Sequence, residues 1–138
     1  MKKMNQKETV LTPAELESRS NKNAAIAEQV FSQESISDEQ RGGFWIKMLD
    51  IKTLRGFYGP DLYAGFSQMT SSFDVQIKKD VDRTGFKGTP EELEVHKQVI
   101  TRVLRAYANL DAECGYGQGI NFIAEMLKQF IPIEENIF

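Results

Sequence analysis

The chain has 138 residues, of which 41% are hydrophobic and 27% are charged, and its net charge is −3. This composition supplies one core, and the acidic balance argues against a general nucleic-acid binder or strong electrostatic attachment to anionic lipid. No apolar run approaches the roughly 20 residues that span a bilayer, and the polar N-terminus does not resemble a signal peptide. The single cysteine, Cys114, can form no internal disulfide and has no Cys/His cluster beside it, so we expect a reducing, cytosolic compartment and no metal site.

A helix is predicted near the N-terminus, after a first dozen polar residues that we expect to be frayed. Thr12-Pro13-Ala14-Glu15 is a capping box with proline at the first helical position, and the helix that it opens should run to about Phe31. Ser32 to Ser35 has the composition of a linker. We therefore predict that residues 1–36 form an N-terminal extension, partly helical or flexible, and that the domain covers residues 37–138.

A second capping box, Ser37-Asp38-Glu39-Gln40, opens a helix with apolar residues at helical spacing, which are Phe44, Trp45, Met48, Leu49 and Ile51. Gly42 and Gly43 lie inside it, and each costs about 1 kcal/mol relative to alanine. That cost indicates close packing at the glycines or a late helix start. Gly56 to Pro60 should break the chain, before a short helix over Asp61 to Phe66 and a loop through Met69 to Ser72.

The next predicted helix carries the motif Ile77-Lys78-Lys79-Asp80-Val81-Asp82-Arg83. Ser71 or Ser72 can cap its start, and Gly85 should end it in the left-handed conformation that glycine adopts at helix C-termini. Residues three and four apart share one helical face, so the inward face should hold Phe73, Ile77, Asp80, Val81 and Thr84.

Two further helices are predicted in the second half of the chain. The clearest capping box, Thr89-Pro90-Glu91-Glu92, opens a helix that ends near Asn109 to Glu113, with a stripe of Leu93, His96, Ile100, Val103, Leu104 and Tyr107. The last complete helix begins around Gln118 and is broken by Pro132, with a buried face of Ile120, Ile123, Met126, Leu127 and Phe130. Glu134 to Phe138 reads as the first turn of another helix. No stretch alternates apolar and polar residues over a strand length, so the predicted fold is all-α, an irregular multi-helix array.

Two side chains in this array suit the chemistry of phosphoryl transfer. Arg83 ends the motif above, and Gln118 lies within Gly115-Tyr116-Gly117-Gln118-Gly119. An arginine can neutralise charge on a transferring phosphoryl group, and a glutamine amide can accept a hydrogen bond from water while donating one to a phosphate oxygen. Simpler interpretations stay open: Arg83 as a cation paired with Asp80 at a helix C-terminus, and Gln118 as a turn residue.

The other candidates favour structural roles. His96, the only histidine, has no nucleophile motif nearby and is expected to be a packed or half-exposed core residue; Cys114 is expected to be structural rather than a nucleophile. Asp80 and Asp82 should point to different helix faces, so they do not form an acid–base pair. The glycine spacing at 115–119 matches neither a P-loop nor a dinucleotide fingerprint. Nothing therefore indicates a self-contained hydrolase.

Taken together, these motifs resemble a TBC domain, the catalytic module of Rab GTPase-activating proteins. Gln76 to Thr84 matches the arginine-finger pattern IxxDxxR followed by threonine, and Gly115 to Ile123 matches the glutamine-finger pattern YxQ with its flanking glycines. The resemblance covers roughly residues 38–138, and its other landmarks, in the family's order, are Arg41 to Leu49, Leu62 to Phe66, Val103 to Tyr107 and Glu134 to Phe138.

The resemblance implies that Arg83 is an arginine finger and Gln118 a glutamine finger, with Ile77, Asp80 and Tyr116 as supporting motif residues. It implies a GTPase-activating protein that acts in trans on a Rab-family small GTPase, in vesicle trafficking and intracellular transport, in the cytoplasm or at endomembrane surfaces. GTP and magnesium would be held by that GTPase, so the chain would need no cofactor of its own. Membrane contact would come only through the GTPase.

The sequence also departs from the family. Gly85 and then Phe86-Lys87 stand where a phenylalanine–proline pair often follows the arginine and threonine, and Gly117 stands where a cysteine is common. The resemblance stops at Phe138, roughly halfway through a full TBC domain, so we expect a domain truncated on its C-terminal side. Self-association is then expected through exposed apolar faces, formed by residues such as Ile120, Ile123, Leu127 and Phe130. The alternative function is a catalytically weak TBC-like module that binds a GTPase or a helical partner without activating it.

Overall fold

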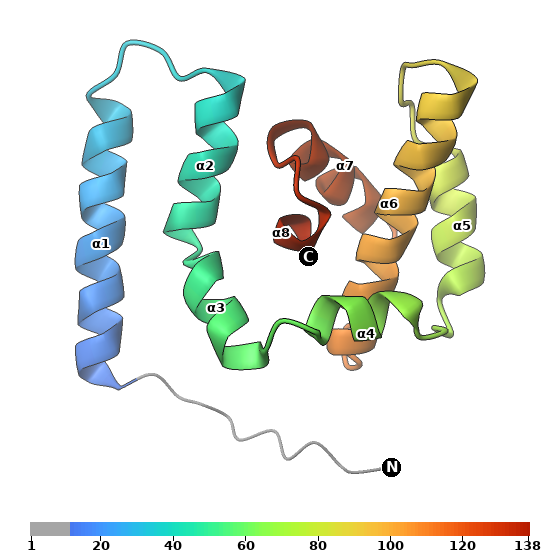
Figure 1. Ribbon diagram of the computed structural model, residues 1–138, viewed down its shortest axis with the longest axis horizontal. Helices are drawn as coiled ribbons and strands as arrows, with labels where there is room; N and C mark the ends of the chain where they lie inside the picture. The colour runs from blue at the N-terminus through green and yellow to red at the C-terminus, as the bar shows by residue number, and fades with distance from the viewer. Residues whose placement is uncertain (1–11) are drawn as a thin grey trace. The chain divides into compact units, whose positions relative to one another are not determined.

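The computed structural model describes residues 12–138, and every regular element in that part of the chain is an α-helix (Figure 1). The all-α prediction is therefore confirmed. The chain divides into a short unit that ends at Ile36, which contains α1 (Pro13–Phe31), and a unit of residues 37–138, which contains α2 to α8. The expectation of fraying concerns residues 1–11, which lie outside the described residues. No helix within residues 12–138 is long and apolar enough to cross a bilayer.

The start of α1 is held by the capping box that the sequence predicts. The Thr12 hydroxyl accepts a hydrogen bond from the backbone N–H of Glu15 at 3.3 Å, and the Glu15 carboxylate accepts one from the backbone N–H of Thr12 at 2.7 Å. These bonds satisfy N–H groups that the first turn of a helix leaves without partners. No residue of α1 is buried, so its stability within its own unit rests on the caps and on local helix propensity.

The predicted continuous helix after Ser37 is wrong, because the chain turns sharply at Asp50. It forms α2 (Asp38–Met48) and α3 (Ile51–Tyr58), and Asp50 between them has φ +53°, a left-handed conformation that aspartate tolerates better than most residues. Met48 and Leu49, predicted to face the core, are exposed. The predicted break after Gly56 is also shifted, because α3 continues to Tyr58 and the turn comes at Gly59, with φ +87°.

Arg83 of the predicted site directly follows α5 (Asp74–Asp82), and α5 itself follows α4 (Leu62–Gln68). Ser71 helps to start α5, since its hydroxyl accepts from the backbone N–H of Phe73 at 3.3 Å, but the N-cap position itself belongs to Phe73. The predicted left-handed end at Gly85 is wrong, because α5 ends at Asp82 and Gly85 has no positive φ. Thr84 provides the reason: its hydroxyl donates to the Val81 carbonyl and so satisfies one of the helix-end carbonyls itself.

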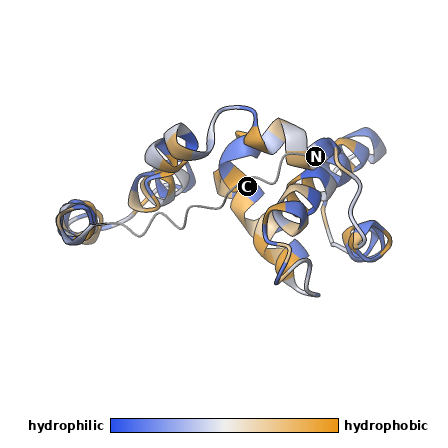
Figure 2. Ribbon diagram, turned by 90° about the horizontal axis from the view of Figure 1, so that it is seen from below, coloured by the Kyte–Doolittle hydropathy of each residue, from blue (hydrophilic) through white to orange (hydrophobic). Residues whose placement is uncertain are grey.

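The core of residues 37–138 is built around α6 (Pro90–Leu110), which contacts α4, α5, α7 (Ile120–Phe130) and α8 (Glu134–Ile137). The third capping box holds the start of α6, with the Thr89 hydroxyl accepting from the N–H of Glu92 at 3.2 Å. The helices carry hydrophobic and hydrophilic residues side by side, as amphipathic helices do (Figure 2). The buried apolar cluster takes residues from α5 to α8, from the 115–119 loop and from the link between α7 and α8: Ile77, Val81, Ile100, Val103, Leu104, Ala108, Tyr116, Ala124, Ile131 and Ile137.

The buried face of α7 differs from the prediction. Ile123 and Met126 are 56% and 43% exposed, whereas the fully buried residues of this helix are Asn121 and Ala124. Ile120, Leu127 and Phe130 are only partly buried. The helix is therefore rotated so that a polar amide faces inward, and a search for apolar periodicity cannot anticipate that. The hydrogen bonds of Asn121 explain the rotation and are described with the site.

The last helix, α8, forms where the sequence predicts it and is held by ion pairs. The Glu134 carboxylate accepts two hydrogen bonds from the Arg102 guanidinium, at 2.7 and 2.8 Å, and a third from the Tyr63 hydroxyl. Arg55 pairs with Glu135 at 3.2 Å. Bidentate pairing of Arg102 with Glu134 fixes orientation as well as distance, and together these contacts fasten α8 to α3, α4 and α6.

Candidate functional site

Asp80 lies at the centre of the candidate site, on the inward face of α5 with 4% of its surface exposed. One carboxylate oxygen, Oδ2, accepts from the Gln76 amide at 3.0 Å and from the Tyr116 hydroxyl at 2.9 Å, while Oδ1 accepts from the Arg83 guanidinium at 2.5 Å. The bond from Gln76 is the main cause that lowers the pKa of Asp80; burial opposes it, and the bonds from Tyr116 and Arg83 add to it. The carboxyl is therefore held in its charged form, which is the form that can orient a guanidinium.

Arg83 caps the C-terminal end of α5 and is anchored on one side only. Its Nε donates to the Lys79 carbonyl at 3.1 Å and one terminal nitrogen donates to Asp80, yet 65% of the side chain is exposed. The predicted ion pair with Asp80 is thus confirmed. A guanidinium has five N–H groups, so this anchoring fixes its direction and leaves donors available to an external anion.

Tyr116 connects the second motif to the same carboxylate. Its ring is 6% exposed, and burial together with the bond to Asp80 raises the pKa of its hydroxyl, which therefore stays protonated as a donor. Gly115 before it has φ +59°, and a Cβ at this position would lie 2.4 Å from the Phe73 ring. Only glycine combines that backbone conformation with so close an approach, and so the loop can bring Tyr116 to α5.

Gln118 follows in the same loop and is exposed. Its side chain is not among the hydrogen-bond partners of Asp80. The connection runs through the backbone, because the Gly119 N–H donates to Asn121 Oδ1 at 3.2 Å and this oxygen lies 3.3 Å from the Tyr116 hydroxyl. The structure therefore brings together Asp80, Arg83 and Tyr116 in one hydrogen-bonded cluster, to which the backbone beside Gln118 is tied.

The predicted supporting residue Ile77 is fully buried beneath this cluster and belongs to the core. Two members of the cluster were not singled out from the sequence, Gln76 and Asn121. Gln76 lies four residues before Asp80, a spacing at which side chains on a helix meet, so this contact was available to sequence reasoning. Asn121 carried no such signal, because a polar residue in the first turn of an amphipathic helix is normally assigned to the solvent side.

The remaining sequence candidates have structural explanations. His96 is 4% exposed and stacks on Phe86, with ring centroids 4.0 Å apart; its Nε2 lies 3.1 Å from Glu125 Oε1. It is a packed core histidine, as predicted, and burial is the main cause that lowers its pKa. Cys114 is exposed, and its interaction with Asp111 raises the pKa of the thiol, which disfavours the nucleophilic thiolate.

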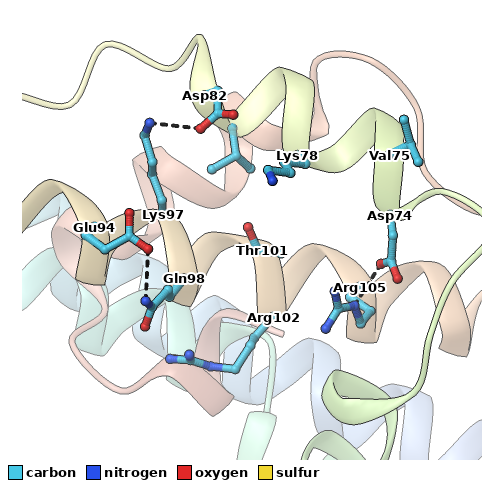
Figure 3. Close-up of a pocket in the computed structure, with 11 residues that line it drawn as sticks. Asp74, Val75, Lys78, Asp82, Glu94, Lys97, Gln98, Thr101, Arg102 and Arg105 are labelled. Atoms are coloured by element: carbon cyan, nitrogen blue, oxygen red, sulfur yellow. Dashed lines mark hydrogen bonds and ion pairs between the residues drawn. The ribbon is translucent and has the colours of Figure 1, made fainter.

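A charged cavity of about 610 Å³ lies between α5 and α6 (Figure 3), and ion pairs engage three of its four cations, Lys97, Arg102 and Arg105. Lys97 pairs with Asp82 at 2.9 Å, and Arg105 pairs with Asp74 at 2.7 Å. Asp82 and Asp80 thus have separate partners, as expected for residues on different helix faces. Within residues 12–138, no group of three or more His, Cys, Asp or Glu side chains is arranged to hold a metal ion.

Comparison with known proteins gives one family match, and residues 38–138 match the Rab-GTPase-TBC domain. The chain is 35% identical over 80 residues to the human ecotropic viral integration site 5 protein homolog, and the aligned segment covers 54% of this chain and 10% of that protein. It is 37% identical over 65 residues to mouse and human TBC1 domain family member 30. The aligned segment covers 46% of this chain, 8% of the mouse protein and 7% of the human protein. The matches thus span a tenth or less of these curated relatives. No solved structure matches the chain.

Proposed function

The chain belongs to the Rab-GTPase-TBC domain family, and from that premise we propose that it activates a Rab-family small GTPase by supplying Arg83 and Gln118 in trans. The GTPase would hold GTP and magnesium, and the chain would add the two side chains that the hydrolysis needs. We place this activity in the cytoplasm, in vesicle trafficking, at membranes that the chain contacts only through its GTPase.

The observation that carries the proposal is the hydrogen bond from the Tyr116 hydroxyl to Asp80, at 2.9 Å. It joins the two motifs, which lie 36 positions apart at these residues. Of the two proposed fingers, the Arg83 side chain is 65% exposed, and Gln118 is exposed as well. A buried hydrogen bond that links the two motifs, with an exposed arginine and an exposed glutamine beside it, is the arrangement expected of groups that act in a partner's active site.

Arg83 would neutralise charge that develops on the γ-phosphoryl group. An arginine supplied in trans accelerates GTP hydrolysis by roughly 10³ to 10⁵, or about 4 to 7 kcal/mol of barrier. Such a gain requires that the guanidinium be oriented before the partner arrives, because immobilising a free arginine costs about 2 kcal/mol of rotamer entropy. The bonds from Arg83 to Asp80 and to the Lys79 carbonyl supply part of that orientation in the free chain.

Gln118 would align the attacking water. Its carbonyl oxygen can accept a hydrogen bond from the water, and its NH₂ group can donate one to a phosphate oxygen, so one side chain can bridge nucleophile and electrophile. Gly117 and Gly119 beside it carry no side chain that would keep the partner's backbone away. The contribution is one of positioning, and positioning of this kind fails when reacting groups move by about 1 Å.

The test is phosphate release from a panel of GTP-loaded Rab GTPases under single-turnover conditions. We expect the chain to stimulate at least one GTPase, and Arg83→Ala to remove about 10³-fold of that stimulation. Gln118→Ala should also remove most of it. Lys78→Ala is the matched control, because Lys78 is an exposed cation on the same helix outside the cluster, and it should retain activity. Stimulation that survives in Arg83→Ala would refute the arginine-finger role.

A second function is favoured by one observation, that the apolar residues Phe122, Ile123 and Met126 of α7 are 60%, 56% and 43% exposed, as in a surface that contacts a partner. In this alternative the chain binds a GTPase or a helical partner without accelerating hydrolysis. Binding measured by titration calorimetry, together with unchanged phosphate release for the whole panel, would support the alternative and reject catalysis.

A further inference from the structure

Asn121 lies in the first turn of α7, three residues after Gln118, and its side chain faces inward. Only 2% of the residue is exposed. Its Oδ1 accepts from the Gly119 N–H at 3.2 Å and lies 3.3 Å from the Tyr116 hydroxyl. Burying an amide costs free energy unless its polar atoms are bonded, and the bond from the Gly119 N–H supplies a partner for the buried Oδ1.

The contact with Gly119 acts on the backbone that carries Gln118. On either side of Gln118, the Gly117 carbonyl accepts a hydrogen bond from the Ile120 N–H at 3.2 Å, and the Gly119 carbonyl accepts one from the Phe122 N–H at 3.1 Å. Both bonds satisfy carbonyls, whereas Asn121 holds the N–H directly after Gln118. Gly119 has φ +106°. Because glycine has no Cβ, its backbone can change from this conformation to one with negative φ at little steric cost. Without the bond from Gly119, the loop would lose one of its restraints on the C-terminal side of Gln118, the one that holds the adjacent N–H.

Tyr116 restrains the other side of the same loop. Its single hydroxyl proton is directed to the charged carboxylate of Asp80 at 2.9 Å, which is a stronger acceptor than the Asn121 amide oxygen at 3.3 Å. Gln118 is therefore enclosed between two restraints, a side-chain bond through Tyr116 and a backbone bond through Gly119. The first restraint ends at Asp80 and the second at Asn121.

We propose that Asn121 is a positioning residue that fixes the backbone at Gln118 for the chemical step. The statement about the chemical step rests on the proposed function, whereas the statement that Asn121 fixes the loop does not. Asn121 is almost completely buried and so does not contact a docked GTPase. Its loss should therefore reduce the rate of hydrolysis in the complex and leave binding of the GTPase intact, because a displacement of about 1 Å already lowers a positioned reaction by about 10²-fold.

The first test is local and independent of activity: amide hydrogen exchange at Gly119, measured by NMR. Asn121→Leu keeps the volume and removes the acceptor, and the Gly119 amide should then exchange about threefold to tenfold faster, as expected for a lost hydrogen bond. Amides of α6 should keep their rates. Asn121→Ala serves the same purpose if leucine prevents folding. Gln129→Leu is the matched control, since it makes a similar replacement at an exposed position of the same helix.

The second test measures kcat and KM of GTP hydrolysis on a GTP-loaded Rab that the unmodified chain stimulates. Asn121→Leu should lower kcat by about 10- to 100-fold and change KM by less than about twofold. An unchanged exchange rate at Gly119 would overturn the proposal, as would faster exchange throughout α6. An unchanged kcat alongside faster exchange would overturn the catalytic part. If the unmodified chain stimulates no GTPase, the proposed function fails, while exchange at Gly119 still decides whether Asn121 fixes the loop.

Discussion

Replacing Gly42 by alanine should destabilise the protein although the residue lies inside a helix, where alanine is normally the better choice. α2 crosses the C-terminal end of α7 at this point, and a Cβ on Gly42 would lie 1.8 Å from the Phe130 carbonyl oxygen and 2.7 Å from its carbon. Both atoms belong to the backbone, so a change of rotamer cannot relieve the clash. The neighbouring Gly43 has no atom within 4 Å of the corresponding position. The two glycines therefore form a matched pair with opposite expected effects.

The magnitude follows from three contributions. Overpacking costs about 1–3 kcal/mol, and the backbone clash places Gly42→Ala near the upper value. Moving α2 away from α7 also weakens the edge-to-face contact of Trp45 with Phe130, at 5.3 Å, which is worth about 0.5–1.5 kcal/mol. Helix propensity returns about 1 kcal/mol. We expect Gly42→Ala to lower the free energy of unfolding by about 2 kcal/mol or more, and Gly43→Ala to raise it by up to about 1 kcal/mol.

Urea unfolding followed by circular dichroism measures both free energies under identical conditions. Near-ultraviolet circular dichroism reports the environment of Trp45 and should change in Gly42→Ala only. If the two variants differ by less than about 0.5 kcal/mol, the close crossing of α2 and α7 is not a feature of the folded protein, and the reasoning fails.

Three further predictions concern the site and the core. Tyr116→Phe should lower the free energy of unfolding by about 1–2 kcal/mol in urea titrations and reduce GTPase stimulation more than binding, because the bond to Asp80 is lost; equal losses of kcat and affinity would contradict this. Gly115→Ala should cost about 1–3 kcal/mol, measured in the same way, because it adds strain at φ +59° to a clash with an aromatic ring; a neutral result would reject the tight turn. Stability should fall as pH drops below about 6.5, because burial lowers the pKa of His96 and the unfolded chain then binds the extra proton. His96→Gln should flatten that pH dependence in urea titrations between pH 5 and 7, and an unchanged slope would assign it to another group.

Local signals in the sequence predict much of this fold. The capping boxes at Thr12, Ser37 and Thr89 all form, because a cap depends on residues three positions apart and on nothing distant. The inward face of α5 was predicted for the same reason. Asp50 shows where local reasoning ends: the apolar spacing continues across it, yet the chain turns there, and only tertiary packing decides whether an apolar residue on either side is buried.

The candidate site divides along the same line. The pairing of Arg83 with Asp80 follows from helical spacing and was predicted, whereas the bond from Tyr116 to Asp80 depends on how α7 and its loop dock on α5. The face of α7 was assigned wrongly because apolar residues were counted and the buried amide of Asn121 was not weighed. Hydrogen bonds satisfied in the interior leave no periodic trace in a sequence, so a structure is needed to find them.

One buried carboxylate serves both motifs, and this has a consequence for how the protein can evolve. A mutation of Asp80 would remove the side-chain acceptor of both Arg83 and Tyr116 at once, so neither motif can drift while the other keeps its partner. Substitutions at these positions should show strong epistasis, with double variants less impaired than the product of the single defects. Any lineage that replaces Asp80 would have to replace its contacts with Arg83 and Tyr116 together. Changes at this carboxylate should therefore be rare and should occur as coordinated substitutions.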